Sequence, residues 1–80
     1  MSQSSQEAEE LARLGQAIRE LREQRGLSQS ELEATVGVGK RRIQALEDGR
    51  LDPYYVLLVR LAKALGVRPG ALLLRAEALG

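Results

Sequence analysis

The sequence predicts an all-α fold built from five short helices. Apolar residues recur three and four positions apart along most of the chain, which places them on one face of a helix. Glycine interrupts this pattern at short intervals, and a glycine just beyond an apolar stripe is a typical helix end. No stretch alternates apolar and polar residues as a half-buried strand would, so we expect no sheet.

The first helix is expected to begin as early as Ser4 and to end at Gly26, where Gly26-Leu27 has the form of a Schellman close. Its buried stripe is formed by Leu11, Leu14, Ile18 and Leu21. Residues 1–10 carry three glutamates and no cation. We therefore expect residues 1–10 to be an acidic segment that either frays or extends this helix, and residues 11–80 to form the domain.

A capping box marks the start of the second helix. In Ser28-x-x-Glu31, each side chain is positioned to bond the backbone N–H of the other. Leu32 and Val36 then face inward, and Gly37 ends the helix.

The third helix is expected to begin near Gly39 or Lys40 and to end at Gly49, with Ile43 and Leu46 facing the core. About three residues join it to the second helix. A turn that is this tight and contains glycine makes two helices cross steeply, as in a helix-turn-helix.

Proline opens the last two helices. Asp52-Pro53 is expected to supply a cap and a first-turn proline for the fourth helix, which runs to Leu65. Pro69 opens the fifth helix, in which Leu72 begins a run of three leucines.

A basic block stands at the start of the third helix. If Ile43 and Leu46 face inward, then at about 100° per residue Lys40, Arg41 and Gln44 project outward, with Arg42 to one side. Arginine and lysine donate to guanine O6 and N7, and glutamine can read adenine. A helix start disfavours positive charge, and a phosphate-lined groove would offset that cost.

These residues carry a family resemblance. G-L-S-Q-S-E-L-E-A-T-V-G-V-G-K-R-R-I-Q-A-L-E-D-G, Gly26 to Gly49, resembles the helix-turn-helix of the phage-repressor and Cro-like (XRE-type) bacterial and phage transcription regulators. The likeness continues through D-P-Y-Y-V-L-L-V-R-L-A-K-A-L-G-V and covers roughly residues 14 to 74. It implies a five-helix lambda-repressor-like domain with the helix-turn-helix at the second and third helices. It also implies sequence-specific DNA binding, with residues 40–48 as recognition helix in the major groove.

At matching positions the resemblance implies DNA contacts by Gln29, Lys40, Arg41, Arg42, Gln44 and Arg50. It also implies a structural ion pair between Arg22 on the first helix and Glu47 at the end of the third. Two positions depart from the family pattern. Glu33 replaces a small residue, so it must bend toward Arg41 or Arg42 or loosen the helix crossing. Gly39 replaces a Ser or Thr cap, at a few tenths of a kcal/mol.

The fourth helix is apolar around nearly its full circumference, and so small a domain has little interior to bury it. We therefore expect a homodimer interface that includes Val56, Val59, Leu73, Leu74 and Leu79. A two-fold dimer would present two recognition helices about 34 Å apart to a palindromic site. We also expect Tyr55 to pack and the Tyr54 hydroxyl to be free to reach a phosphate.

Composition excludes several other classes. The chain has no cysteine and no histidine, so the usual metal ligands and the commonest general base are missing. We expect no enzyme activity, no metal and no cofactor. No apolar run approaches the roughly 18 residues of a membrane span, so we expect a cytoplasmic protein.

The alternative to a DNA-binding regulator is an antitoxin or adaptor that acts mainly by binding a protein partner through the fourth and fifth helices.

Overall fold

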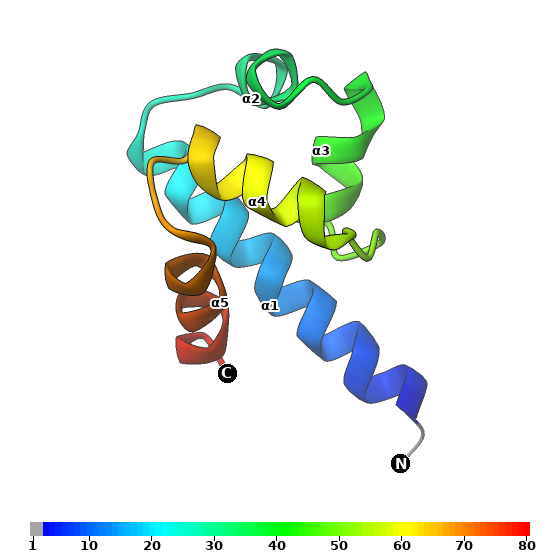
Figure 1. Cartoon of the computed structure of the whole chain (residues 1–80). Coiled ribbons are helices and arrows are strands. Elements are labelled where there is room, and N and C mark those ends of the chain that lie inside the picture. The colour runs from blue at the N-terminus through cyan, green and yellow to red at the C-terminus, as the bar shows by residue number, and fades with distance from the viewer. Residues whose placement is uncertain (1–2) are drawn as a thin grey trace.

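The computed structural model describes the backbone of residues 3–80 and the side chains of residues 5–39 and 41–80. Within these residues the chain forms five helices and no strand (Figure 1). They are α1 (Gln3–Gln24), α2 (Gln29–Val36), α3 (Lys40–Glu47), α4 (Tyr55–Ala64) and α5 (Pro69–Ala78). The predicted all-α class and the number of helices are confirmed.

The core is aliphatic and draws on every helix. α1 packs against α3 and α5, while α4 packs against α2 and α5. The largest fully buried side chains are Ile18, Leu32, Ile43, Leu46, Leu57, Leu61, Leu65 and Leu72. The N-terminal end of α1 extends past the other four helices (Figure 1), and residues 5–10 are all exposed.

Hydrogen bonds confirm the predicted C-terminal end of α1 and the predicted N-terminal start of α2. The Leu27 N–H donates to the Arg22 carbonyl at 3.1 Å, as in a Schellman close. At the start of α2 the Ser28 N–H donates to Glu31 Oε1 at 2.8 Å, and the Glu31 N–H donates to Ser28 Oγ at 3.0 Å. Hydrogen bonding of the Glu31 carboxyl to Ser28, first to its backbone N–H and then to its side chain, lowers the pKa of that carboxyl.

The turn between α2 and α3 depends on Gly37. Its φ is 81°, in the left-handed region that favours glycine, and its N–H donates to the Glu33 carbonyl at 2.8 Å. Gly39 then caps α3 without a side-chain hydrogen bond. Figure 1 shows α2 nearly end-on while α3 runs down the page, so the two helices cross steeply.

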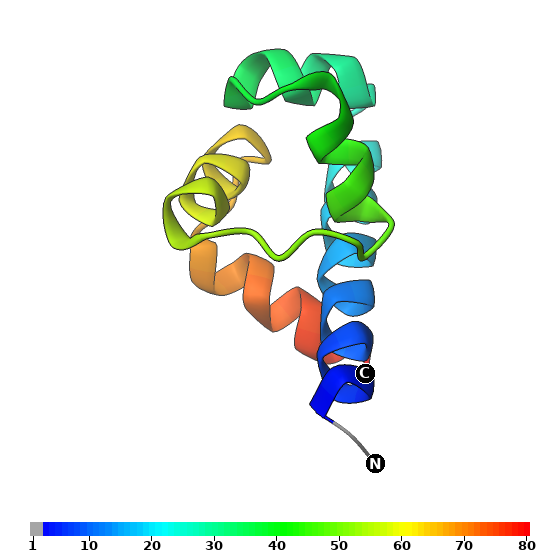
Figure 2. The ribbon, with the colours of Figure 1, turned by 90° about the vertical axis from the view of Figure 1, so that its right-hand side faces the viewer.

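The start of α4 differs from the prediction. Asp52 and Pro53 do not open the helix, because Pro53 is buried in the loop and Tyr54 is the N-cap residue. The loop from α3 crosses one face of the molecule before α4 begins (Figure 2). The expectation that Tyr55 packs is also wrong, since Tyr55 is 74% exposed and Tyr54 is 55% exposed. Pro53, rather than a tyrosine, anchors this segment.

Gly15 lets α1 approach the end of α3. A Cβ atom at this position would lie 2.6 Å from the Glu47 carbonyl oxygen and also against the Leu46 carbonyl oxygen. Both atoms belong to the backbone, which cannot rotate away as the end of a side chain could. The sequence reading missed this residue, because a glycine inside a helix pattern signals only a loss of helix propensity.

Glu47, the last residue of α3, joins three helices. Its side chain is fully buried. Arg22 of α1 donates through Nε to Oε2 at 2.6 Å and through Nη2 to Oε1 at 3.0 Å. Gln29 of α2 donates through Nε2 to Oε1 at 2.9 Å. Arg19 of α1 adds a longer bond of 3.4 Å. The carboxylate therefore fixes the end of α3 against α1 and the first residue of α2.

These contacts determine the charge state of Glu47. Burial alone would raise the pKa of the carboxyl, but the hydrogen bonds from Arg22 and Gln29 and the Arg22 charge outweigh it. The pKa of Glu47 therefore lies below its ordinary value. The same hydrogen bond raises the pKa of the Arg22 guanidinium, so the pair stays ionised. A buried carboxylate with several donors avoids the cost of an unpaired charge.

Substitution of Gly15 tests the close approach of α1 and α3. Gly15→Ala is expected to destabilise the protein by about 1–3 kcal/mol, because the helices must move apart to admit the methyl group. Gly70→Ala is the control, since a Cβ atom there meets nothing within 4 Å. It should be neutral or stabilising by up to about 1 kcal/mol. Urea unfolding of both variants measures the difference, and equal stabilities would contradict the close approach.

Substitution of Glu47 tests the buried carboxylate. Glu47→Gln is expected to lower the free energy of unfolding at pH 7 by about 3 kcal/mol, because it leaves the Arg22 charge without its partner. Since the folded-state pKa lies below the ordinary value of 4.5, the contribution of Glu47 is present above that pH and is lost as the pH falls through the folded-state pKa. The gap between variant and wild type should therefore narrow below about pH 4.5.

The neighbouring acid supplies the control for this experiment. Asp48→Asn changes two exposed ion pairs, with Arg19 and with Arg50, and should cost less than about 1 kcal/mol. Urea unfolding between about pH 3 and pH 7 measures the free energy of unfolding of the wild type, Glu47→Gln and Asp48→Asn. A Glu47→Gln gap that stays constant over this range would show that the carboxylate charge is not the cause of the difference.

Candidate nucleic-acid interface

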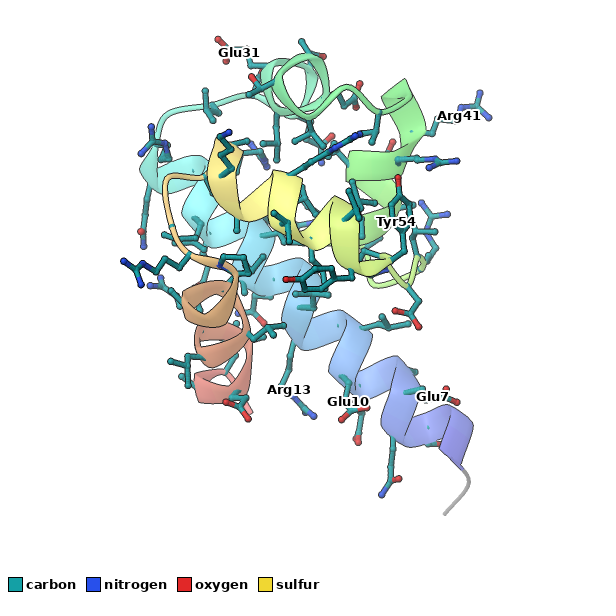
Figure 3. All side chains as sticks on the ribbon, in the orientation of Figure 1. Glu7, Glu10, Arg13, Glu31, Arg41 and Tyr54 are labelled. Atoms are coloured by element: carbon teal, nitrogen blue, oxygen red, sulfur yellow. The ribbon has the colours of Figure 1, made fainter. Side chains whose placement is uncertain are left out.

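The outer face of α3 carries exposed hydrogen-bond donors. Ile43 and Leu46 are buried, which fixes the inner face of this helix. Arg41, Arg42 and Gln44 are exposed on the other faces. Figure 3 shows Arg41 projecting away from the body of the molecule. The side chain of Lys40 lies outside the described residues, so only its place at the first position of α3 is established.

The first turn of α3 concentrates positive charge. It contains no acidic residue, and the free backbone N–H groups of a helix start add a positive potential. Among the described side chains, neither Arg41 nor Arg42 forms an ion pair. A cluster of cations without carboxylate partners favours an anionic ligand such as phosphate.

Arg50 lies beyond the other end of α3. Its Nη2 contacts Asp48 Oδ2 at 3.1 Å, while Asp48 Oδ1 accepts from Arg19 Nη2 at 3.5 Å. The Arg50 side chain is 64% exposed. Cationic groups therefore flank α3 at both ends. Arg19 is one of them, and it was not predicted because no periodic pattern in the sequence links it to α3.

Gln29 has a second role that the sequence did not reveal. Its amide nitrogen is bound to Glu47, so the side chain is held in place and half-buried. An amide has two N–H donors and a carbonyl acceptor, and the bond to Glu47 uses one donor. Gln29 therefore stands at the start of α2 with hydrogen-bonding capacity remaining.

Glu33 is half-buried on α2. Within the described side chains it forms no ion pair with Arg41 or Arg42. Glu33 therefore does not neutralise Arg41 or Arg42 of α3.

The apolar residues expected at a dimer interface differ in exposure. Val56 is 50% exposed, Leu73 46% and Leu74 65%. Val59 and Leu79 are half-buried, and Leu79 packs against the core. Three of the five side chains are thus free to form intermolecular contacts. Among the described helices, none is long and apolar enough to cross a membrane.

Comparison with known proteins identifies a helix-turn-helix domain in this chain. A family model described as a helix-turn-helix domain matches residues 15–77. An HTH-type transcriptional regulator of Methanothermobacter thermautotrophicus is 51% identical over 49 residues, which are 61% of this chain and 71% of that protein. One of Sinorhizobium fredii is 41% identical over 54 residues, 68% of this chain and 70% of that protein.

Solved structures agree with the sequence relatives. The restriction-modification controller protein C.AhdI from Aeromonas hydrophila is 35% identical, with a TM-score of 0.75 over 78% of this chain and 94% of that chain. The clp gene regulator ClgR from Corynebacterium glutamicum is 28% identical, with a TM-score of 0.84 over 88% of this chain and 74% of that chain. The lambda-repressor-like fold is therefore confirmed. The chain belongs to the helix-turn-helix family of phage-repressor and Cro-type transcriptional regulators, which bind double-stranded DNA.

Proposed function

We propose that this protein binds a specific palindromic DNA sequence as a homodimer, with α3 in the major groove. The observation that carries the proposal is the two-sided character of α3. One face is fully buried and anchored through Glu47, while the opposite face presents Arg41, Arg42 and Gln44 to solvent. A helix held rigidly with free donors on its outer face meets the geometric requirement for reading base edges.

The side chains divide into two groups by the part of the DNA that each would contact. Lys40, Arg41 and Gln44 read base edges, since arginine and lysine bond guanine and glutamine bonds adenine. Arg42 and Arg50 contact phosphates, which set the position of the protein on the duplex and carry no sequence information.

Gln29 lies at the boundary between these groups, near the DNA backbone and the first base pair of a half-site. Its bond to Glu47 supports this role, because the anchored amide loses little conformational entropy when it binds. The Tyr54 hydroxyl, exposed at the start of α4, remains available for a phosphate.

Dimerisation would supply a second copy of α3 to bind the second half-site of the DNA. The exposed Val56, Leu73 and Leu74 provide apolar area that a two-fold axis can bury on both copies. The likeness to a restriction-modification controller protein favours a gene-regulatory role over that of an antitoxin or adaptor. The protein would act in the cytoplasm without cofactor or catalysis.

Selection from a random pool of duplexes tests the reading role of α3. At about 150 mM salt, where phosphate attraction is weakened, we expect a palindrome with half-site centres about one helical turn apart. Arg41→Ala should weaken binding to the selected site by about 1–3 kcal/mol and relax the preference at one base pair. Arg68→Ala is the control, since Arg68 is exposed before α5, far along the chain from α3.

Either of two results would contradict the reading role. One is recovery of no motif, with binding that disappears as salt rises. The other is an equal loss of affinity in Arg41→Ala and Arg68→Ala, which would indicate attraction by general charge rather than by the face of α3.

Sedimentation tests the dimer separately. At tens of micromolar we expect the wild type to be dimeric. Leu74→Asp is expected to raise the dissociation constant by more than about tenfold, since like charges would face each other across the two-fold axis. Ala34→Asp, an exposed position on α2, is the control and should leave the dimer intact. A wild-type monomer at this concentration would contradict the proposal.

A further inference from the structure

A groove separates the N-terminal half of α1 from α5 and the loop before α4. Its volume is about 860 Å³, within the range of protein binding clefts. Its apolar lining is formed by Leu11, Leu14, Leu58, Leu73 and Ala76. We call it the acidic groove, because its polar lining includes Glu7, Glu10, Asp52 and Glu77.

The charge around this groove is mainly negative. Four carboxylates line it against one cation, Arg13. Within the described residues none of the four carboxylates takes part in an ion pair. Glu7, Glu10 and Arg13 follow one another along α1, at the other end of the molecule from Arg41 (Figure 3). Among the described side chains that line the groove, Arg13 alone offsets part of the negative potential.

This charge rejects three classes of occupant. Nucleic acid and anionic lipid are repelled by four carboxylates. A second copy in a two-fold arrangement would place the same acidic rim against itself, which costs several kcal/mol for close like charges. Of the five proposed dimer residues, Leu73 alone lines the groove, so the dimer surface and the acidic groove are largely separate.

We propose that the acidic groove docks a cationic amphipathic helix of another protein. The apolar stripe of such a helix would cover Leu11, Leu58 and Leu73, while its lysines and arginines would pair with the carboxylates on the rim. Residues of α1, α4 and α5 and of the loop before α4 form its walls, so the docked helix would contact several elements at once.

The N-terminal turns of α1 support this assignment. Residues 5–10 are all exposed, so this part of the 22-residue helix α1 gains little stability from tertiary packing. A docked helix would bury part of this segment and stabilise it. Because Arg41 projects from the far end of the molecule, a protein partner and DNA can be bound together.

A model peptide tests the proposal. The probe is a fluorescein-labelled 18-residue peptide of leucine and lysine, with leucine at positions i, i+3, i+4 and i+7. Anisotropy titration at low salt, where charge pairing is least screened, should show saturable binding. A peptide of the same composition in scrambled order should bind at least about tenfold more weakly, since it cannot present an apolar stripe.

Two neighbouring glutamates give a matched pair of variants. Glu10 lines the groove and Glu9 does not, although both are exposed. Glu10→Lys should weaken peptide binding at least about fivefold by charge reversal, whereas Glu9→Lys should change it little. In methyl NMR spectra the peptide should shift the resonances of Leu11, Leu58 and Leu73.

Five results would overturn the proposal, four of them from the peptide experiments. These four are the absence of saturable binding, equal binding of the scrambled peptide, equal effects of Glu9→Lys and Glu10→Lys, and methyl shifts confined to other surfaces. Shifts of the Leu11 and Leu58 methyls with protein concentration alone would assign the groove to a second copy and would also overturn it, because neither residue belongs to the proposed dimer surface. None of these results depends on DNA binding, so the docking proposal and the proposed function fail separately.

Discussion

The buried carboxylate of Glu47 is the interaction on which the placement of α3 depends. With eight residues and no side-chain cap, α3 is too short to be stable by itself. Ile43 and Leu46 hold its inner face by burial, which opposes separation but allows sliding. The directional bonds of Glu47 to Arg22 and Gln29 prevent that sliding, because a charged buried group loses several kcal/mol when its partners move away.

The same network determines which polar side chains stay free on the surface of the domain. Arg22 is withdrawn into the structure, and Gln29 is held at the start of α2. The cations that remain unpaired among the described side chains of α3, Arg41 and Arg42, are those on its outer faces. Acidic side chains collect instead around the groove at the other end of the molecule. One small domain thereby separates a surface suited to phosphate from a surface suited to a basic protein.

Local signals in the sequence predicted much of this fold, and long-range contacts account for what they missed. The Ser28 capping box and the Gly26 close depend on residues within a few positions of each other, so their patterns identify the ends of helices directly. The start of α4 was misplaced because the Asp52-Pro53 pattern is a local helix-start signal, whereas the structure buries Pro53 in the loop and begins the helix after Tyr54. Gly15 was missed for a similar reason, since its role exists only where α3 passes over it. The bond from Gln29 to Glu47 spans 18 positions, and no spacing rule reports it.

The most direct test of this account is the affinity of Glu47→Gln for the selected DNA site, measured where the variant is still folded. The substitution replaces none of the residues proposed to contact DNA and removes one negative charge, which by itself would strengthen DNA binding. We predict instead a loss of at least about tenfold for the selected site, because displaced base contacts cost about 1–3 kcal/mol each, with salt-sensitive nonspecific binding retained. An affinity equal to or above that of the wild type would contradict the claim that this carboxylate positions α3.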